Sequence, residues 1–116
     1  MSTQRSYCPD ENNLIWLNFD PQTGREKAGR RPALVLSPRS YNEKTGLAIV
    51  CPITNQAKGF PFEVLLTAGL KVKGVVLSDH VKNLSWLVRD STYIEDAPPD
   101  VVDDVKAKIK ALINIE

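Results

Sequence analysis

The sequence predicts a mainly-β fold, a small antiparallel β-barrel followed by a C-terminal α-helix. Two observations predict it. Between residues 13 and 88, short apolar runs rich in β-branched and aromatic residues alternate with polar turns that contain Gly and Pro, which is typical of short antiparallel strands. Only the last segment, after residue 98, has helical spacing of its apolar residues. The length of 116 residues suits one domain, 1–116, with a core of ordinary size.

We expect five to seven short strands. The first ends at DPQTG, where Asp20-Pro21 starts a turn. Pro32 opens the second strand and Pro38 closes it, and SYNEKTG is expected as a polar connection. Pro52, within the third run, favours an edge strand or a bulge because proline cannot donate to a strand ladder. AGLKVKG reads as a hairpin-like connection, and DHVKN as a short helix or loop. The expected strands are residues 13–19, 33–37, 47–54, 62–67, 75–78 and 86–88.

The C-terminal helix is expected after Ala97-Pro98-Pro99. Asp100 is a candidate N-cap, and Asp103, three residues on, resembles the acidic partner of a capping box. Its lysines lie towards the negative end of the helix dipole. One apolar stripe should pack on the barrel, formed by Val102, Val105, Ile109, Leu112 and Ile113.

Composition excludes several classes of protein. No apolar run is long enough to span a membrane, and the N-terminus shows no secretion signal, so we expect a cytoplasmic protein. Cys8 and Cys51 are expected to be reduced and structural. One His and two Cys make no metal-ligand cluster, so we expect no metal and no cofactor. With His80 as the single imidazole, two histidines cannot exchange acid and base roles within one chain.

The charge is unevenly distributed along the chain. The net charge is +1, but residues 25–89 carry eleven Lys and Arg against four Asp and Glu, a balance of +7, and the remainder carries −6. A basic middle indicates one surface that attracts a polyanion. The alternative is that the fold mixes these charges in space.

The stretch REKAGRRP is the first place to look for catalysis. Arg31 precedes Pro32 and a strand, so its guanidinium could be held to give two donors to a phosphate; alternatively it forms a salt bridge with Glu26. Glu26 lies among cations that should keep it ionised, as a base, as a partner that orients Arg31, or as a solvated charge. Thr54 ends a strand, where its hydroxyl could donate to a phosphate oxygen or be an ordinary strand-end threonine.

A second group of residues suits RNA binding. The segment LSDHVKNLSW mixes polar groups with one aromatic ring, as a surface for unpaired bases requires, although Trp86 followed by Leu87 and Val88 is equally compatible with a core strand. The candidate RNA-binding residues are Arg25, Lys27, Arg30, Asn42, Gln56, Lys58, Ser78, Asp79, Lys82, Ser85 and Trp86.

Three stretches carry motifs that are specific in combination: LIWLNFDPQTGREKAGRRPALVLSPRSYN, KTGLAIVCPITNQAKGFPFEVLL and GVVLSDHVKNLSW. They contain G-x-E-x-x-G-x-R-P before a strand, then P-x-T, then S-D-x-V-K. Over roughly residues 7–113 the sequence resembles the MazF/PemK family of toxin endoribonucleases from bacterial toxin–antitoxin pairs.

The resemblance implies an SH3-like barrel with a C-terminal helix, a homodimer, and a cognate MazE-like antitoxin whose acidic, disordered segment lies in the basic groove. It implies metal-independent, sequence-specific cleavage of single-stranded mRNA, in which 2′-hydroxyl attack leaves 2′,3′-cyclic phosphate and 5′-hydroxyl ends and growth is inhibited. The family's arginine, threonine and glutamate fall on Arg31, Thr54 and Glu26. Arg30 stands where several relatives have His, which gives Glu26, Thr54 or Arg31 more weight in proton transfer. The alternatives are a non-enzymatic toxin of this fold that poisons gyrase, and a plain RNA-binding module.

Overall fold

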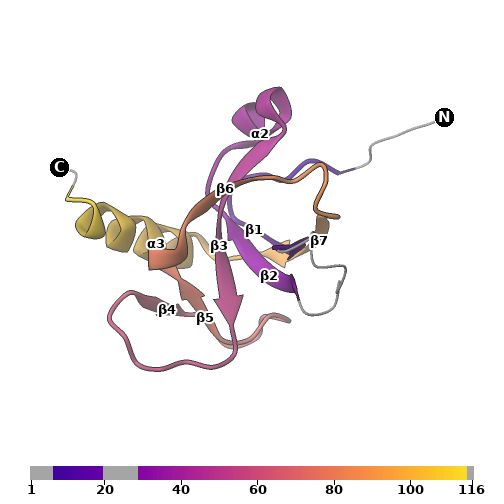
Figure 1. Ribbon diagram of the computed structural model, residues 1–116. Coiled ribbons are helices and arrows are strands. Elements are labelled where there is room, and N and C mark those ends of the chain that lie inside the picture. The colour runs from indigo at the N-terminus through magenta and orange to yellow at the C-terminus, as the bar shows by residue number, and fades with distance from the viewer. Residues whose placement is uncertain (1–6, 20–28, 115–116) are drawn as a thin grey trace.

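A computed structural model describes residues 7–19 and 29–114 of the chain (Figure 1). It contains a seven-stranded sheet and a long C-terminal helix. The strands are β1 Asn13–Asn18, β2 Arg30–Val35, β3 Leu47–Thr54, β4 Glu63–Leu65, β5 Val75–Leu77, β6 Lys82–Ser85 and β7 Thr92–Asp96. The helices are α2 Arg39–Thr45, the 3₁₀ turn η2 Ser78–His80, and α3 Pro99–Leu112.

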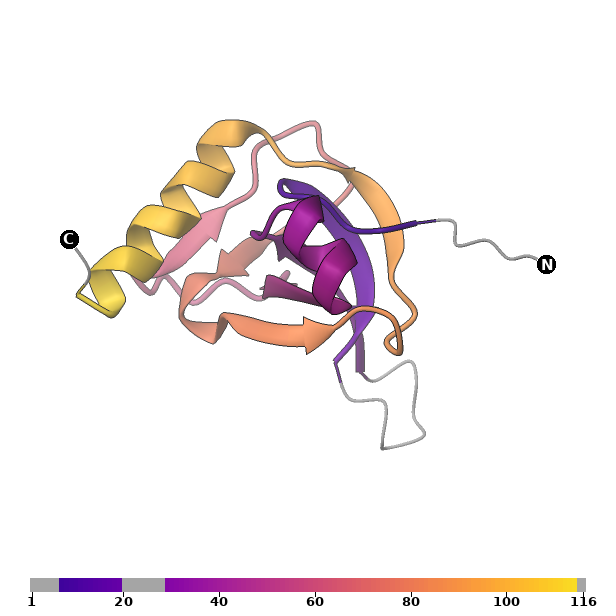
Figure 2. The ribbon, with the colours of Figure 1, turned by 90° about the horizontal axis from the view of Figure 1, so that it is seen from above.

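Every strand pair is antiparallel, in the order β4-β5-β3-β2-β1-β7, with β6 also paired to β3. The sheet curves strongly, and α3 lies along one side of it, against β4 and η2 (Figure 2). This confirms the predicted fold class. None of the helices in the described ranges has the length and apolar character needed to cross a bilayer.

The predicted edge position of Pro52 is wrong, because β3 is the central strand. Along one side β3 pairs with β2, where Pro52 faces Ala33. Along the other it pairs with β6 up to Val50 and with β5 from Ile53 onward. Pro52 therefore lies at the changeover between two partner strands, where its missing amide removes no ladder hydrogen bond.

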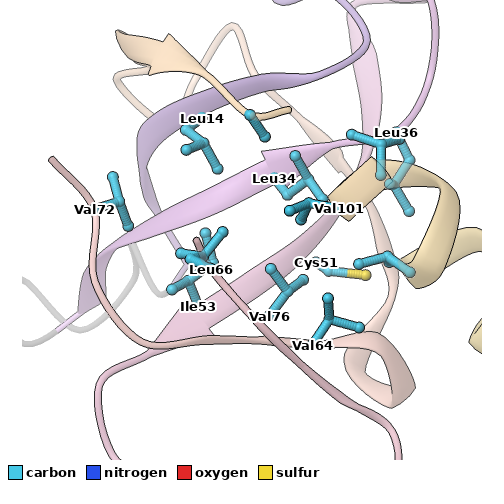
Figure 3. Close-up of a cluster of buried hydrophobic side chains, with 13 residues drawn as sticks. Leu14, Leu34, Leu36, Cys51, Ile53, Val64, Leu66, Val72, Val76 and Val101 are labelled. Atoms are coloured by element: carbon cyan, nitrogen blue, oxygen red, sulfur yellow. The ribbon is translucent and has the colours of Figure 1, made fainter. Parts of the chain in front are cut away.

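The core lies on both faces of the central strands. Alternation along β1 sends Leu14 into a cluster beneath α3 and Ile15 into a second cluster on the opposite face. The first cluster joins Leu34, Cys51 and Val101 with other apolar side chains from the sheet and the helix (Figure 3). Burial on both faces explains why these strands read as continuous apolar runs rather than as alternating ones.

Several local expectations are corrected. SYNEKTG belongs largely to α2, which ends at Gly46 in the left-handed conformation, φ 74°. Residues 86–88 are not a strand, since β6 ends at Ser85 and a turn follows, while β7 was not anticipated. In α3 the N-cap is Pro98 and no side chain caps the helix, so the proposed Asp100–Asp103 capping box does not form.

The apolar stripe of α3 also begins earlier and ends sooner than predicted. Val101, Val102 and Val105 are buried, whereas Leu112 and Ile113 are exposed. Only the first half of the stripe therefore packs on the sheet.

Candidate active site

Two grooves meet at the end of the barrel where β3 ends and β2 begins, towards the bottom of Figure 1. The large groove has a volume of about 770 Å³ and the small groove about 340 Å³. Arg31, Thr54 and Gln56 line both, so these three side chains stand at the junction. The large groove is completed by Trp16, Arg30, Pro32, Ile53, Asn55, Lys71, Val72, Lys73 and Ile94. The small groove is completed by Lys58, Phe60, Phe62, Glu63, Leu77, Asp79 and His80.

The strand register brings Arg31 and Thr54 together. The β2–β3 ladder ends at the pair Ala33 and Pro52. Continuing this register by two residues places Arg31 opposite Thr54, and both side chains line the same two grooves. Arg31 is exposed, and no other group in residues 7–19 or 29–114 forms a hydrogen bond or an ion pair with its guanidinium. All its donors are therefore open to a ligand from the described part of the protein.

Thr54 is oriented by its own loop. The backbone amide of Gln56 donates to Thr54 Oγ1 at 3.2 Å, so the hydroxyl oxygen accepts and its proton remains free to donate. The loop before β5 approaches closely on the other side. A Cβ at Gly74 would lie 2.1 Å from the Thr54 carbonyl oxygen, and Gly74 has φ 116°. Only glycine allows this approach.

The large groove is basic and has one aromatic wall. Lys71 and Lys73 line it from the loop between β4 and β5. Arg30 lies on the opposite wall, with its guanidinium 5.9 Å from the centre of the Trp16 ring. Arg30 is already engaged, because it donates to the Asp90 carbonyl oxygen at 2.9 Å and to Thr92 Oγ1 at 3.1 Å, and pairs with Asp90 Oδ2 at 3.3 Å. Its charge still adds to the groove, but its geometry is fixed by β7 and the preceding turn.

The small groove has a different chemistry. Phe60 and Phe62 stack with ring centroids 5.3 Å apart. Asp79 and His80 come from η2, with Asp79 Oδ1 3.8 Å from His80 Nε2. Lys58 contributes a cation. The small groove therefore offers a ring face, a carboxylate and positive charge next to the Arg31–Thr54 pair.

Cysteine does not supply a nucleophile at this site. Burial, with a smaller contribution from the nearby Asp79 carboxylate, raises the pKa of the Cys51 thiol to about 12. Cys8 and Cys51 are not joined in a disulfide. Within residues 7–19 and 29–114 no cluster of three His, Cys, Asp or Glu side chains is arranged to hold a metal. What the described site offers is a guanidinium and a hydroxyl, both suited to a phosphodiester.

Comparison with known proteins assigns the family. Residues 11–113 match the PemK-like, MazF-like toxin of type II toxin–antitoxin systems. The chain belongs to this toxin family. It is 49% identical to the endoribonuclease toxin MazF of Escherichia coli strain K12, over 92% of this chain and 96% of that protein. The crystal structure of MazF from Deinococcus radiodurans superposes with a TM-score of 0.87 at 52% identity, covering 95% of this chain and all of that one. MazF in the MazE–MazF complex of the same organism gives 0.86 at 48% identity, covering 96% and 100%.

Of the predicted site residues, the structure brings six to the grooves. Arg31, Thr54 and Gln56 lie at the junction, Arg30 lines the large groove, and Lys58 and Asp79 line the small one. Arg30 and Arg31 belong to β2 rather than to the exposed loop that we expected for residues 25–31. Glu26, Arg25 and Lys27 lie outside the described residues.

Three predicted RNA-binding residues are buried, which contradicts their assignment. Asn42 and Ser78 are 0% exposed and Trp86 is 8% exposed. Asn42 Nδ2 donates to two backbone carbonyls, of Pro9 and Ser37, and Trp86 Nε1 donates to the Asn42 carbonyl at 3.0 Å. These groups hold α2 on the sheet, so Trp86 is the core residue of the alternative reading. The Ser78 hydroxyl has no hydrogen-bond partner and faces the interior.

Lys82 and Ser85 do not line either groove, because β6 pairs with the half of β3 that is remote from Thr54. Conversely, the sequence analysis did not single out Trp16, Lys71, Lys73, Phe60 or Phe62 as site residues. Trp16 was assigned to a strand without regard to its face. The pattern K-V-K at 71–73 was a detectable signal, since two lysines at alternate positions of a short connection point to the same side.

Proposed function

We propose that this chain cleaves single-stranded mRNA without a metal ion, as the toxin of a type II toxin–antitoxin pair. One observation carries the proposal: an exposed guanidinium and a strand-end hydroxyl lie side by side where two grooves meet, and neither groove offers another nucleophile. Membership of the toxin family and 49% identity to an endoribonuclease support it. Cleavage of mRNA would block translation and growth, in the cytoplasm where mRNA is translated.

The chemistry follows from the groups available. The substrate's 2′-hydroxyl oxygen attacks the adjacent phosphorus, the O2′–P bond forms and the P–O5′ bond breaks. The products are a 2′,3′-cyclic phosphate and a 5′-hydroxyl. The phosphorane on this path carries extra negative charge, which the Arg31 guanidinium stabilises with two donors while the Thr54 hydroxyl donates to a second oxygen. DNA lacks the attacking hydroxyl and is not cut.

Proton transfer needs one acceptor and one donor. We assign Glu26, which shares the motif of Arg31, as the base that takes the 2′-hydroxyl proton or as the group that orients Arg31. His80 lines only the small groove, and at position 30 the chain has an arginine, which stays protonated. The leaving O5′ takes its proton from a protonated side chain or from water.

The large groove suits both RNA and an acidic peptide. Lys71, Lys73 and Arg30 give its walls positive charge that releases counterions from a bound phosphate chain. We propose that a MazE-like antitoxin places an acidic segment along the same cations and excludes RNA. The Deinococcus radiodurans relative is found in a MazE–MazF complex. We also propose a homodimer, as in other members of this family.

The test is incubation of the purified protein with a long single-stranded RNA in EDTA, followed by sequencing of the ends. Cleavage at a short recurrent motif, with cyclic phosphate and 5′-hydroxyl ends, is the expected result. Arg31→Ala should lose about 10²- to 10³-fold in kcat. Arg39→Ala is the matched control, because Arg39 is exposed, removes the same charge and lies on α2, away from both grooves. Intact RNA, or full activity of Arg31→Ala, would overturn the proposal.

A further inference from the structure

The small groove contains an aromatic pair for which the cleavage step has no use. Phe60 and Phe62 stack at 5.3 Å with an interplanar angle of 23°. Phe60 is 49% exposed, and Phe62 is half-buried behind it. Both belong to the connection between β3 and β4, which sweeps along the lower edge of the barrel in Figure 1. A ring supported on one face and open on the other is the arrangement that stacks on a nucleobase.

The loop that carries Phe60 is already ordered by hydrogen bonds. The Glu63 carboxylate accepts from the amide of Lys58 at 3.1 Å and from the amide of Gly59 at 3.0 Å. The Glu63 amide donates back to the Phe60 carbonyl oxygen at 3.1 Å. Because these bonds exist in the free protein, little conformational entropy is lost when a base stacks on the ring.

Asp79 gives the small groove a hydrogen-bond preference. An ionised carboxylate only accepts hydrogen bonds. Asp79 Oδ1 is 3.8 Å from His80 Nε2, too far for a hydrogen bond, and no other donor in the described part of the chain contacts the Asp79 carboxylate. A base with an exocyclic amino group can donate to it. Uracil presents a single N–H between two carbonyl oxygens, which the carboxylate repels.

We propose that the small groove binds one nucleobase bearing an amino group, stacked on Phe60 and donating to Asp79. The inference rests on the proposed function, and it adds the group that selects the substrate. Because Arg31, Thr54 and Gln56 line both grooves, the bound base belongs to a nucleotide next to the cleaved linkage. The groove volume of about 340 Å³ lies at the lower end of the range for ligand pockets, which suits a single base.

The experiment uses an oligonucleotide that the wild-type protein cuts, made non-cleavable by a 2′-deoxy sugar at the cut linkage. A series replaces each neighbouring nucleotide in turn by an abasic one, and affinity is measured by fluorescence anisotropy at fixed salt. At one position the abasic change should weaken binding to the wild type by roughly 5- to 150-fold. Phe60→Leu should weaken binding of the intact oligonucleotide by a similar factor and leave binding of that abasic one unchanged.

Two further variants sharpen the test. Phe60→Tyr keeps the ring and should restore binding. Asp79→Asn, which adds a donor, should reduce the preference for an amino-bearing base over uracil at the same position by roughly 5-fold or more. Tyr93→Leu is the matched control, because Tyr93 is 46% exposed but alternates with Ile94 of the large groove and so points to the other face.

The outcomes separate the two proposals. If Phe60→Leu weakens the intact and all abasic oligonucleotides equally, or weakens none, the assignment of this subsite is wrong although cleavage stands. If the wild type cuts no RNA in the first place, the proposed function fails and the subsite with it.

Discussion

Replacing Gly74 by Ala should damage both the stability of the fold and the site. The new Cβ would lie 2.1 Å from the Thr54 carbonyl oxygen and 2.9 Å from Asn55 Cα, so the loop or the end of β3 has to move by about 1 Å. Overpacking of this kind costs about 1–3 kcal/mol, and a non-glycine residue at positive φ adds about 1–2 kcal/mol. We therefore expect a loss of about 2–5 kcal/mol out of a total near 5–15 kcal/mol.

Gly69→Ala separates these two contributions. Gly69 has φ 96° in the same loop, and an added Cβ there meets nothing within 4 Å. It should therefore cost only the positive-φ penalty, measured as the free energy of unfolding in urea. Because Thr54 moves only in the Gly74 variant, that variant should also lose roughly 100-fold in kcat/KM at a temperature where it stays folded. Equal destabilisation by the two variants would refute the close approach of Gly74 to Thr54.

Three more predictions concern single side chains. Asn42→Ala should lower the free energy of unfolding by about 2–4 kcal/mol, because it leaves buried carbonyls without donors, yet leave kcat/KM of the folded protein unchanged; a fall in kcat/KM alone would restore a role in binding. Arg30→Ala should cost at most about 1 kcal/mol, since its pair with Asp90 is partly exposed, but should raise KM and reduce its salt dependence. The Cys51 thiol has a pKa of about 12 in the fold against an ordinary 9.0, so above pH 9 the unfolded chain loses a proton that the folded chain keeps, and stability should fall by about 1.4 kcal/mol per pH unit. Urea unfolding between pH 8 and 10 checks this, and Cys51→Ala should show a shallower fall.

Sequence reasoning located the strands where the local signal and the tertiary environment agree. The run at 47–54 is apolar and bounded by turn residues, and it forms β3 with those bounds. α2 has no apolar stripe and no side-chain N-cap, so nothing local predicts it. It is held instead by hydrogen bonds between distant segments, such as that from Trp86 Nε1 to the Asn42 carbonyl oxygen. β7 likewise depends on its pairing with β1, which no local pattern encodes.

The candidate site was predictable in proportion to how much of it lies on paired strands. Arg31 next to Pro32 and Thr54 at a strand end carried a signal that the β2–β3 register brings together. Burial separated the remaining polar residues, because a segment such as 78–86 places Asp79 in the small groove and Ser78 in the interior within two positions. Sequence spacing cannot distinguish these two when the chain turns through a 3₁₀ element.

The division between strands and loops has a consequence for how substrate choice can vary. Arg31 and Thr54 are fixed by the ladder, so substitutions there should change whether RNA is cut. The groove walls come from the connections 55–62 and 66–74, whose side chains can change without breaking strand pairing. Grafting these two connections from a relative that cuts a different motif should therefore change the motif and preserve the end chemistry. If the graft changed the chemistry of the ends and kept the motif, the assignment of catalysis to strands and recognition to loops would be reversed.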